Sequence, residues 1–314
     1  MAKWLKEVAI LAVLLLVVSA CSTESPGSDN GEGSSSEGDS DDSVKVGLSI
    51  STLNNPFFVT LRDGAEAAAE EAGYEIVVTD AQDDASSQLS DIEDLLQQEI
   101  DVLLVNPVDS EAVVTAIESA NTQDVPVITV DRSTEGGEVV THIASDNVAG
   151  GEIAGEYIAE QLGESGSVVE LQGVPGASAT NERGEGFHNI VDDMGDLEVV
   201  AQQSANFNRS EGLTVMENII QSTDNIDAVF AHNDEMALGA VEALQSNSML
   251  EDVLVVGFDA TDDAVAAVEE GTMDATIAQQ PELIGENAID AVGSVVNDES
   301  LDEFIPVELQ MVTE

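Results

Sequence analysis

The amino-acid sequence predicts an α/β protein made of two similar lobes, each built on a doubly wound parallel sheet. Short runs rich in β-branched residues alternate with stretches whose apolar residues recur at three- and four-residue steps, as in amphipathic helices. Most of the runs are continuously apolar, which is typical of parallel strands covered by helices on both faces. The 314 residues hold more such runs than one open sheet usually contains, so we expect two lobes.

Residues 1–20 have the features of a secretory signal. Two lysines precede an apolar run from Val8 to Val18, and small residues follow it. The run is shorter than the roughly 20 apolar residues that a membrane-spanning helix needs. Residues 18–21 resemble a bacterial lipobox, and Cys21 is the single cysteine of the chain. We therefore expect a lipoprotein lipidated at Cys21, with a plain signal peptide as the alternative.

Residues 21–43 are predicted to be a tether between the lipid and a globular part. After Cys21 the segment consists mostly of Ser, Gly, Asp and Glu, and it has no basic residue. Such a composition cannot bury enough apolar surface to fold. As a flexible coil it would span about 25 Å.

From residue 44 onward the strand-like runs and helical patterns alternate to the end of the chain. The predicted strands are 46–50, 76–79, 102–105, 127–130, 168–171, 199–201, 228–231, 253–258 and 275–278. Helical periodicity lies between them, for example over Ile92–Leu96 and Val113–Ala120. A regular strand–helix order with right-handed crossovers gives doubly wound sheets.

The charge of the chain excludes one class of partner and predicts an environment. The formal net charge is −57, with 7 basic residues against 64 acidic ones. A nucleic-acid binder needs Lys and Arg to replace counterions, so no nucleic acid is expected. Self-repulsion of this size opposes compaction unless salt screens it. We predict a halophilic protein that loses structure on desalting, with an acidophilic or alkaliphilic origin as the alternative.

Candidate functional residues lie just after the predicted strands, because ligands of open α/β sheets bind beyond the carboxyl ends of the strands. These positions hold amides, carboxylates, arginines and phenylalanines, and no nucleophile stands beside a base. His142, His188 and His232 lack metal-ligand spacing. We therefore expect no catalytic residue, metal or cofactor. Amides, carboxylates and guanidinium groups match the hydroxyls of a sugar, and flat rings match its C–H faces.

The scarcity of basic residues singles out two arginines. Beyond the tether only Lys45, Arg62, Arg132, Arg183 and Arg209 remain. Arg132 directly follows a strand and Arg183 begins a helix, so we favour ligand contact over a structural salt bridge for both. Arg62 lies inside a helical pattern and is expected to be structural.

Seven motifs, in order and at matching spacings from about 44 to 312, resemble the ribose-binding proteins of bacterial ABC importers. They are STLNNPFF (51–58), NPVD (106–109), VITVDR (127–132), HIASDN (142–147), ERGEGF (182–187), NDEMALG (233–239) and VVGFD (255–259).

The resemblance implies two lobes joined by a three-stranded hinge with one sugar between them. It places an N-terminal lobe at 44–145 plus 280–308, and a C-terminal lobe at 146–279 plus 309–314. It implies stacking by three rings with Asn106 in support, and hydrogen bonding by seven polar side chains. The ligand-binding residues implied are Asn55, Phe57, Phe58, Asn106, Asp131, Arg132, Arg183, Phe207, Asn233, Asp259 and Gln279.

The function implied is an extracytoplasmic, monomeric binding lipoprotein, anchored to the membrane, that passes D-ribose to an ABC-transporter permease. Whether a chemoreceptor also reads the closed form stays open. Another small sugar, such as allose, galactose or a furanose signal molecule, is the main alternative ligand. A secreted carbohydrate-active enzyme is a more distant alternative. Sugar-responsive repressors share the lobes but begin with a basic helix-turn-helix, where this chain has its signal.

Overall fold

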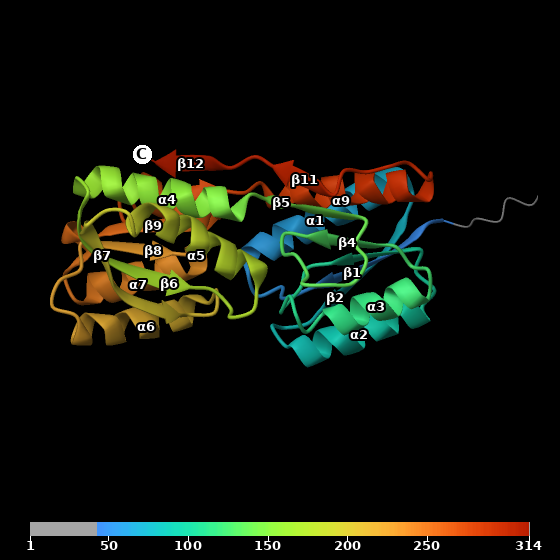
Figure 1. Ribbon diagram of the computed structural model, residues 1–314, viewed down its shortest axis with the longest axis horizontal. Coiled ribbons are helices and arrows are strands. Elements are labelled where there is room, and N and C mark those ends of the chain that lie inside the picture. Colours follow the sequence, from blue (N-terminus) through green and yellow to red (C-terminus); the bar gives the residue numbers. More distant parts are fainter. Residues whose placement is uncertain (1–42, 314) are drawn as a thin grey trace, which may run out of the picture. The chain divides into compact units, whose positions relative to one another are not determined.

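The computed structural model describes residues 43–313, all of which lie in one compact unit. The predicted signal, Cys21 and nearly all of the tether lie outside the described residues. Two α/β lobes make up the described part, each with a six-stranded sheet, and helices cover both faces of each sheet (Figure 1).

The first sheet has the strand order β11-β5-β4-β3-β1-β2, and all its pairs are parallel. Its strands are β1 (Lys45–Ile50), β2 (Glu75–Asp80), β3 (Val102–Val105), β4 (Val127–Val130), β5 (Thr141–Ser145) and β11 (Phe304–Val307). Its helices are α1 (Pro56–Ala72), α2 (Ala85–Gln97), α3 (Val114–Thr122) and α9 (Pro281–Val296). One apolar core lies under α1 and α9 and another under α2 and α3, so the central strands are buried on both sides.

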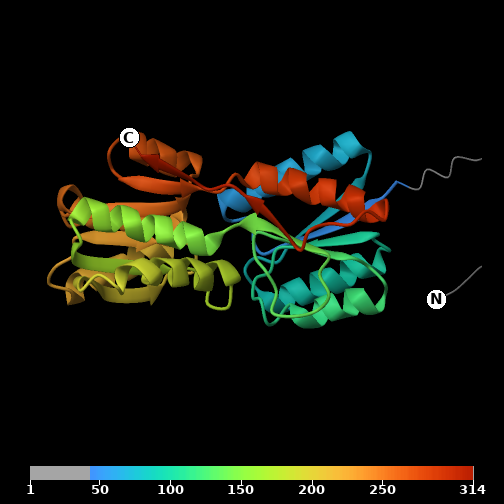
Figure 2. The same ribbon diagram turned by 45° about the horizontal axis from the view of Figure 1, so that its top comes forward.

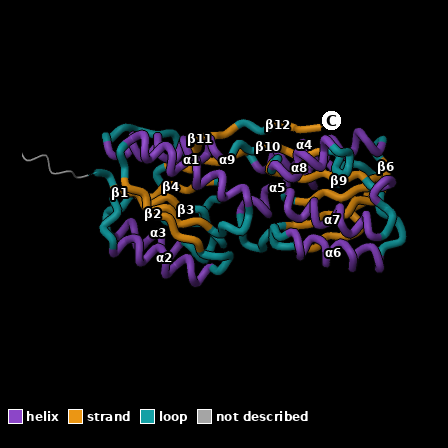
Figure 3. The backbone as a smooth tube through the Cα atoms, turned by 180° about the vertical axis from the view of Figure 1, so that it is seen from behind, coloured by secondary structure: helices purple, strands orange, loops and turns teal. Residues whose placement is uncertain are grey.

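The second sheet has the order β12-β10-β9-β8-β6-β7. Its strands are β6 (Ser165–Gln172), β7 (Asp196–Ser204), β8 (Ala228–Ala231), β9 (Leu254–Asp259), β10 (Ala275–Ala278) and β12 (Gln310–Thr313). Its helices are α4 (Asn147–Leu162), α5 (Ser178–Val191), α6 (Arg209–Ser222), α7 (Asp234–Ser246) and α8 (Asp262–Glu269), with a 3₁₀ turn at Leu250–Asp252. Helices α4 and α5 cover one face, and α6, α7 and α8 the other (Figure 3).

The prediction of α/β lobes with largely parallel sheets is confirmed, but the sequence analysis omitted three strands. Strand β5 follows β4 without a helix, so the strand–helix alternation is broken there. Strands β11 and β12 lie at the sheet edges, and β12 pairs antiparallel with β10. These three strands were not predicted because polar or exposed residues, such as His142 and Phe304, interrupt their apolar pattern.

Within the described residues the chain passes from one sheet to the other three times. The crossings follow β5, follow β10, and lie between β11 and β12 (Figure 2). We propose the lobe limits 44–145 plus 280–308 and 146–279 plus 309–314, which divide the chain at these crossings. In the described part of the chain, no helix has the length and apolarity to cross a membrane.

Two glycines let α4 and α5 approach closely, and this approach places the helix that carries Arg183. A Cβ atom on Gly151 would lie 2.1 Å from the carbonyl oxygen of Arg183, and one on Gly186 would lie 1.9 Å from that of Val148. Both distances are far below van der Waals contact, so the helix backbones touch where any side chain would separate them.

Candidate functional site

Ten of the eleven predicted site residues line one cavity between the two lobes. The lining residues are Asn55, Phe57, Phe58, Asp131, Arg132, Ala179, Arg183, Phe207, Asn233, Asp259 and Gln279. The cavity volume is about 10 Å³, roughly the space of one water molecule. The side chains therefore close on one another in this arrangement, and a larger molecule could enter only if the lobes separate.

The eleventh predicted residue, Asn106, supports the cavity from behind. Its side chain is fully buried, and its Nδ2 donates to Oδ2 of Asp131 at 3.2 Å and to the Val130 carbonyl at 3.1 Å. Its Oδ1 accepts from the Ser51 amide at 3.2 Å. Asn106 thus fixes the carboxylate of Asp131, as expected of a supporting residue.

Two asparagines owe their orientation to helix capping. Asn55 is the N-cap of α1 and its Oδ1 accepts from the amide of Phe57 at 3.0 Å. Asn233 is the N-cap of α7 and its Oδ1 accepts from the amide of Met236 at 3.0 Å. A capping oxygen satisfies free amides of the first helical turn. The cap uses only the amide oxygen of each side chain, and Nδ2 of Asn233 donates to the Phe207 carbonyl at 3.5 Å.

The buried arginine Arg132 lies between two aromatic rings. Its guanidinium carbon is 5.0 Å from the ring centre of Phe58 and 5.2 Å from that of Phe207. Nη1 donates to the Pro107 carbonyl at 3.1 Å, and Nε lies 3.8 Å from Oδ2 of Asp131. Burial lowers the pKa of Arg132 while Asp131 raises it. Arg132 remains charged, because the guanidinium stays protonated in proteins.

The second buried arginine, Arg183, is held by three polar groups and one aromatic ring. Nε donates to Oδ1 of Asn147 at 2.9 Å, and Nη1 donates to the carbonyl oxygen of His232. Nη1 also lies 3.7 Å from Oδ1 of Asp259. The guanidinium carbon stacks 3.8 Å from the ring centre of Phe258, a fully buried residue of the lobe core. Phe258 therefore backs Arg183 and does not line the cavity.

Burial raises the pKa of the two cavity carboxylates. The pKa of Asp131 lies above its usual value because of burial, although Arg132 and Arg183 lower it. The pKa of Asp259 lies well above its usual value, again through burial and against the lowering effect of Arg183. Two guanidinium groups facing two carboxylates keep the buried charges paired.

Three buried polar atoms of the cavity residues have no hydrogen-bond partner among the described residues. They are Oδ1 of Asp131, Nε of Arg132 and Oε1 of Gln279. Leaving a buried donor or acceptor unpaired costs about 1–3 kcal/mol. Two acceptors and one donor in one small cavity fit a ligand that both donates and accepts hydrogen bonds.

Backbone strain is concentrated at the same place. Asp131, Phe207 and Asp259 have φ angles of 62°, 56° and 116°, in the region that favours glycine. Such conformations cost roughly 1–3 kcal/mol each and cluster at binding sites, where the surrounding fold imposes them. These three φ angles set the directions of three side chains that line the cavity.

The lobes touch beside the cavity. The amide of Ser110 donates to the Gly176 carbonyl at 3.0 Å, and the amide of Ser133 donates to Oγ of Ser178 at 2.9 Å. Both hydrogen bonds join loops of the first lobe to the segment that leads into α5. The cavity is therefore enclosed by contacts that separation of the lobes would break.

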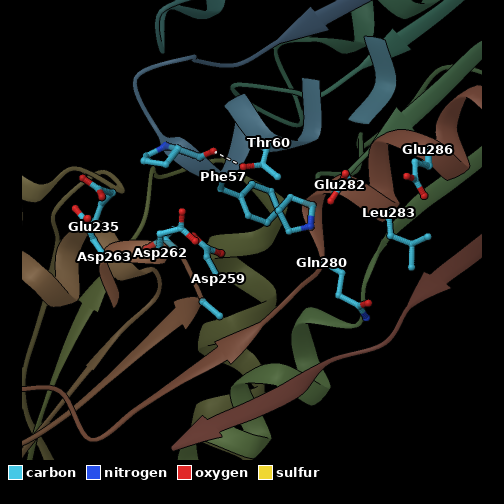
Figure 4. Close-up of a pocket in the computed structure, with 14 residues that line it drawn as sticks. Phe57, Thr60, Glu235, Asp259, Asp262, Asp263, Gln280, Glu282, Leu283 and Glu286 are labelled. Carbon is cyan, nitrogen blue, oxygen red and sulfur yellow. Dashed lines mark hydrogen bonds between the residues drawn. The ribbon is translucent and has the colours of Figure 1, made fainter. Parts of the chain in front are cut away.

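A wider pocket borders the cavity and shares Phe57 and Asp259 with it (Figure 4). Its volume is about 660 Å³. Carboxylates dominate its lining, among them Glu235, Asp262 and Glu282. Because both buried arginines and three unpaired buried polar atoms belong to the smaller cavity, we assign the site to that cavity.

The other two arginines form ion pairs outside the cavity. Arg62 forms ion pairs with Asp63 and Glu66 on its own helix, as expected of a structural residue. Arg209 bridges Glu235 and Asp263 at 2.7 and 2.8 Å. Two residues of the site were not predicted. Ala179 lines the cavity but has no polar side chain that would mark it. Asn147 binds Arg183 and is the last residue of the HIASDN motif.

A family model, the periplasmic binding protein domain, matches residues 46–300. The ribose import binding protein RbsB of Bacillus subtilis is 50% identical over 307 residues, covering 97% of each chain. The protein of the same name from Escherichia coli is 48% identical over 267 residues, covering 85% of this chain and 90% of its own. A D-apiose import binding protein of Actinobacillus succinogenes is 36% identical and covers 70% of this chain and 71% of its own.

Solved structures show the same fold. An ABC-transporter solute-binding protein of Bacillus halodurans with bound myo-inositol has a TM-score of 0.82 and 33% identity, covering 86% of this chain and 94% of its own. A periplasmic solute-binding protein of Actinobacillus succinogenes with bound D-allose has a TM-score of 0.81 and 29% identity, covering 86% and 97%. From the matched domain and these relatives, the chain belongs to the periplasmic binding protein family.

Proposed function

We propose that this protein captures D-ribose between its two lobes and delivers it to the permease of an ABC importer. The observation that carries the proposal is the cavity bordered by three phenylalanine rings, in which three buried polar atoms have no partner in the part of the chain that the structure describes. A pentose supplies hydroxyls for the polar atoms and C–H faces for the rings. The choice of ribose is supported by the names of the relatives that are 48–50% identical.

Both lobes would contribute residues that bind the sugar. Asn55, Asp131 and Arg132 would bind hydroxyls from the first lobe. Arg183, Asn233, Asp259 and Gln279 would bind hydroxyls at the face of the second. Phe57, Phe58 and Phe207 would pack against the sugar. Because each lobe contributes, the sugar would stabilise the closed arrangement by its differential affinity for it.

Titration calorimetry with a panel of pentoses and hexoses tests the ligand. We expect D-ribose to bind more tightly than allose, galactose or a furanose sugar, because a ligand that misplaces a hydroxyl leaves a buried group unpaired. Arg132→Ala should weaken ribose binding by about a hundredfold, as expected when one partner of a buried charge pair is removed. The matched control is Arg62→Ala, whose ion pairs lie at the surface. Tighter binding of another sugar would replace ribose as the ligand.

The protein is a binding protein and not an enzyme, as the family and its relatives show. Its place outside the cytoplasm follows from the same family. We further propose that lipidated Cys21 anchors it to the membrane, and that residues 22–43 act as the tether. Detergent phase partitioning and mass spectrometry of the processed N-terminus test the anchor. A Cys21→Ala variant should move to the aqueous phase, and an unmodified Cys21 would contradict the proposal.

We also propose that the protein is adapted to high salt. The support is the net charge of −57, whose self-repulsion falls when the screening length shrinks to about 3 Å at molar salt. Circular dichroism and thermal unfolding in molar and in dilute potassium chloride test this. A melting temperature that does not change between the two would overturn it.

A further inference from the structure

Behind the cavity, the second lobe buries a carboxylate, Glu170, in the middle of β6. Its side chain is fully buried, and its neighbours Val169 and Leu171 are apolar core residues. Oε1 accepts from Nε2 of His232 at 2.8 Å, and Oε2 contacts Nε2 of His188 at 3.1 Å. Gln202 adds a 2.6 Å hydrogen bond to Oε2. A buried charge costs several kcal/mol unless it is paired. The carboxylate of Glu170 can therefore stay ionised inside the sheet only while these three partners bind it.

The cluster reaches the cavity through His232. The carbonyl oxygen of His232 accepts from Nη1 of Arg183, and the next residue is the cavity residue Asn233. The imidazole is fully buried, and its Nδ1 has no partner within the described part of the chain. Among the described residues, Glu170 is the one group that forms a hydrogen bond with this imidazole. The carboxylate therefore fixes the residue whose backbone holds the arginine.

A second contact joins the cluster to the helix that carries Arg183. Gly184 follows Arg183, and a Cβ atom placed on it would lie 3.4 Å from Oε1 of Glu170 and 3.5 Å from Cε1 of His232. The first turns of α5 thus pack directly on the carboxylate and its histidine. A shift of either would move Arg183.

His188 is the member of the cluster that solvent reaches, since its side chain is 30% exposed. Its Nδ1 contacts Oδ1 of Asp192 at 3.0 Å. The titratable or charged groups around it are Asp192, Glu185 and Arg183 on α5, Glu170 on β6, His232 after β8, and Glu152 on α4, which binds the neighbouring Asn189. Burial lowers the pKa of His188, but its hydrogen bonds to Asp192 and Glu170 outweigh this and raise it overall. Burial lowers the pKa of His232, whose side chain is fully buried, so His188 is the histidine of this cluster that can exchange a proton with solvent.

We propose that Glu170 and His232 are positioning residues for Arg183, and that the proton on His188 couples pH to the affinity of the sugar cavity. With His188 charged, the carboxylate of Glu170 is balanced. Once His188 loses its proton, an uncompensated negative charge lies behind Arg183 and draws its guanidinium away from the ligand. This inference rests on the proposed sugar-binding function.

Calorimetry with D-ribose across about pH 5.5 to 8.5, the range in which histidine changes charge, tests the coupling. The dissociation constant of the parent protein should rise about fivefold towards high pH, at the lower end of the coupling usual between linked sites. His188→Gln should show no such rise. His232→Leu should weaken binding about tenfold, whereas His232→Gln should restore it, because its amide can still donate to Glu170.

His142→Gln is the matched control. His142 belongs to the other sheet, its Nδ1 contacts Oγ1 of Thr129 at 2.9 Å, and burial lowers its pKa to about 4. This variant should keep the parent pH profile. Thermal unfolding monitors the folding of each variant. A parent-like pH profile in His188→Gln, or equal affinities for His232→Leu and His232→Gln, would overturn the inference. Absence of sugar binding by the parent protein would instead overturn the proposed function.

Discussion

Nε2 of Gln279 donates a 2.7 Å hydrogen bond to Oδ1 of Asp259, where β10 and β9 end beside each other. The same oxygen lies 3.7 Å from Nη1 of Arg183. This bond leaves Oε1 of Gln279 without a partner among the described residues. One carboxylate therefore orients both the amide and the guanidinium that we expect to meet the sugar.

Replacing Asp259 by alanine should weaken ribose binding by about a hundredfold, because it leaves the buried Arg183 without its carboxylate partner. Calorimetry measures the change. The matched control is Asp263→Asn, because the Asp263 side chain is 67% exposed and pairs with Arg209 at the surface. The control should bind within about twofold of the parent, as exposed ion pairs contribute little. Equal losses in the two variants would contradict the role given to Asp259.

Phe207 owes its position to the absence of a side chain at residue 173. A Cβ atom on Gly173 would lie 2.0 Å from Cζ of Phe207, so Gly173→Ala must displace this cavity-lining ring. We expect ribose affinity to fall about tenfold or more, given the roughly 1–3 kcal/mol cost of overpacking. Gly195→Ala is the control, since no atom lies within 4 Å of its added carbon. Unchanged affinity in Gly173→Ala would show that the ring position does not matter.

The positions of most site residues could be predicted because strand ends are visible in the sequence. Continuously apolar runs such as Val102–Val105 and Val127–Val130 are strands with all residues buried, and the residues after them meet at one edge of the sheet. Asp131, which follows the second of these runs, lines the cavity accordingly. Arg132 and Arg183 were selected for another reason, the scarcity of basic residues in the chain. Both are buried and line the cavity.

What the sequence left out depends on packing between distant segments. Glu170 interrupts an apolar strand, which signals a buried charge in need of partners, but its partners come from α5, β7 and the loop after β8. The strain at Asp259 and the contact between Gly173 and Phe207 also arise only in the assembled fold. Edge strands β11 and β12 were missed because edges need no continuous apolar run.

Asp234 should make stability depend on pH. It is fully buried, accepts from Oγ1 of Thr276 at 2.6 Å and from the amide of Thr261 at 2.7 Å, and burial raises its pKa to about 7. Between about pH 4 and 7 the folded protein holds a proton that the unfolded chain has released. The free energy of unfolding should therefore fall as pH rises through this window, by up to about 1.4 kcal/mol per pH unit for one proton.

Asp234→Asn tests this, because the side chain no longer titrates while its amide oxygen still accepts from Thr261. Its amide nitrogen would donate to the Thr276 hydroxyl, which can accept as well as donate. Denaturant unfolding at several pH values should give a shallower pH dependence for this variant than for the parent. Asp262→Asn, in the exposed first turn of α8, should keep the parent slope. Identical slopes for the parent and Asp234→Asn would place the titration elsewhere, on Asp131 or Asp259, whose pKa values burial also raises.

The hydrogen bond from the amide of Ser133 to Oγ of Ser178, at 2.9 Å, joins the lobes beside the cavity. Ser178→Ala should remove it without touching the cavity lining, so closure loses about 1 kcal/mol. Ribose should then dissociate about fivefold faster, because the bond exists only while the lobes are together. Stopped-flow dissociation measures this rate. Ser90→Ala removes an exposed hydroxyl that bonds within α2 and should leave the rate unchanged. A slower association rate with normal dissociation in Ser178→Ala would mean that the bond forms before the sugar is enclosed.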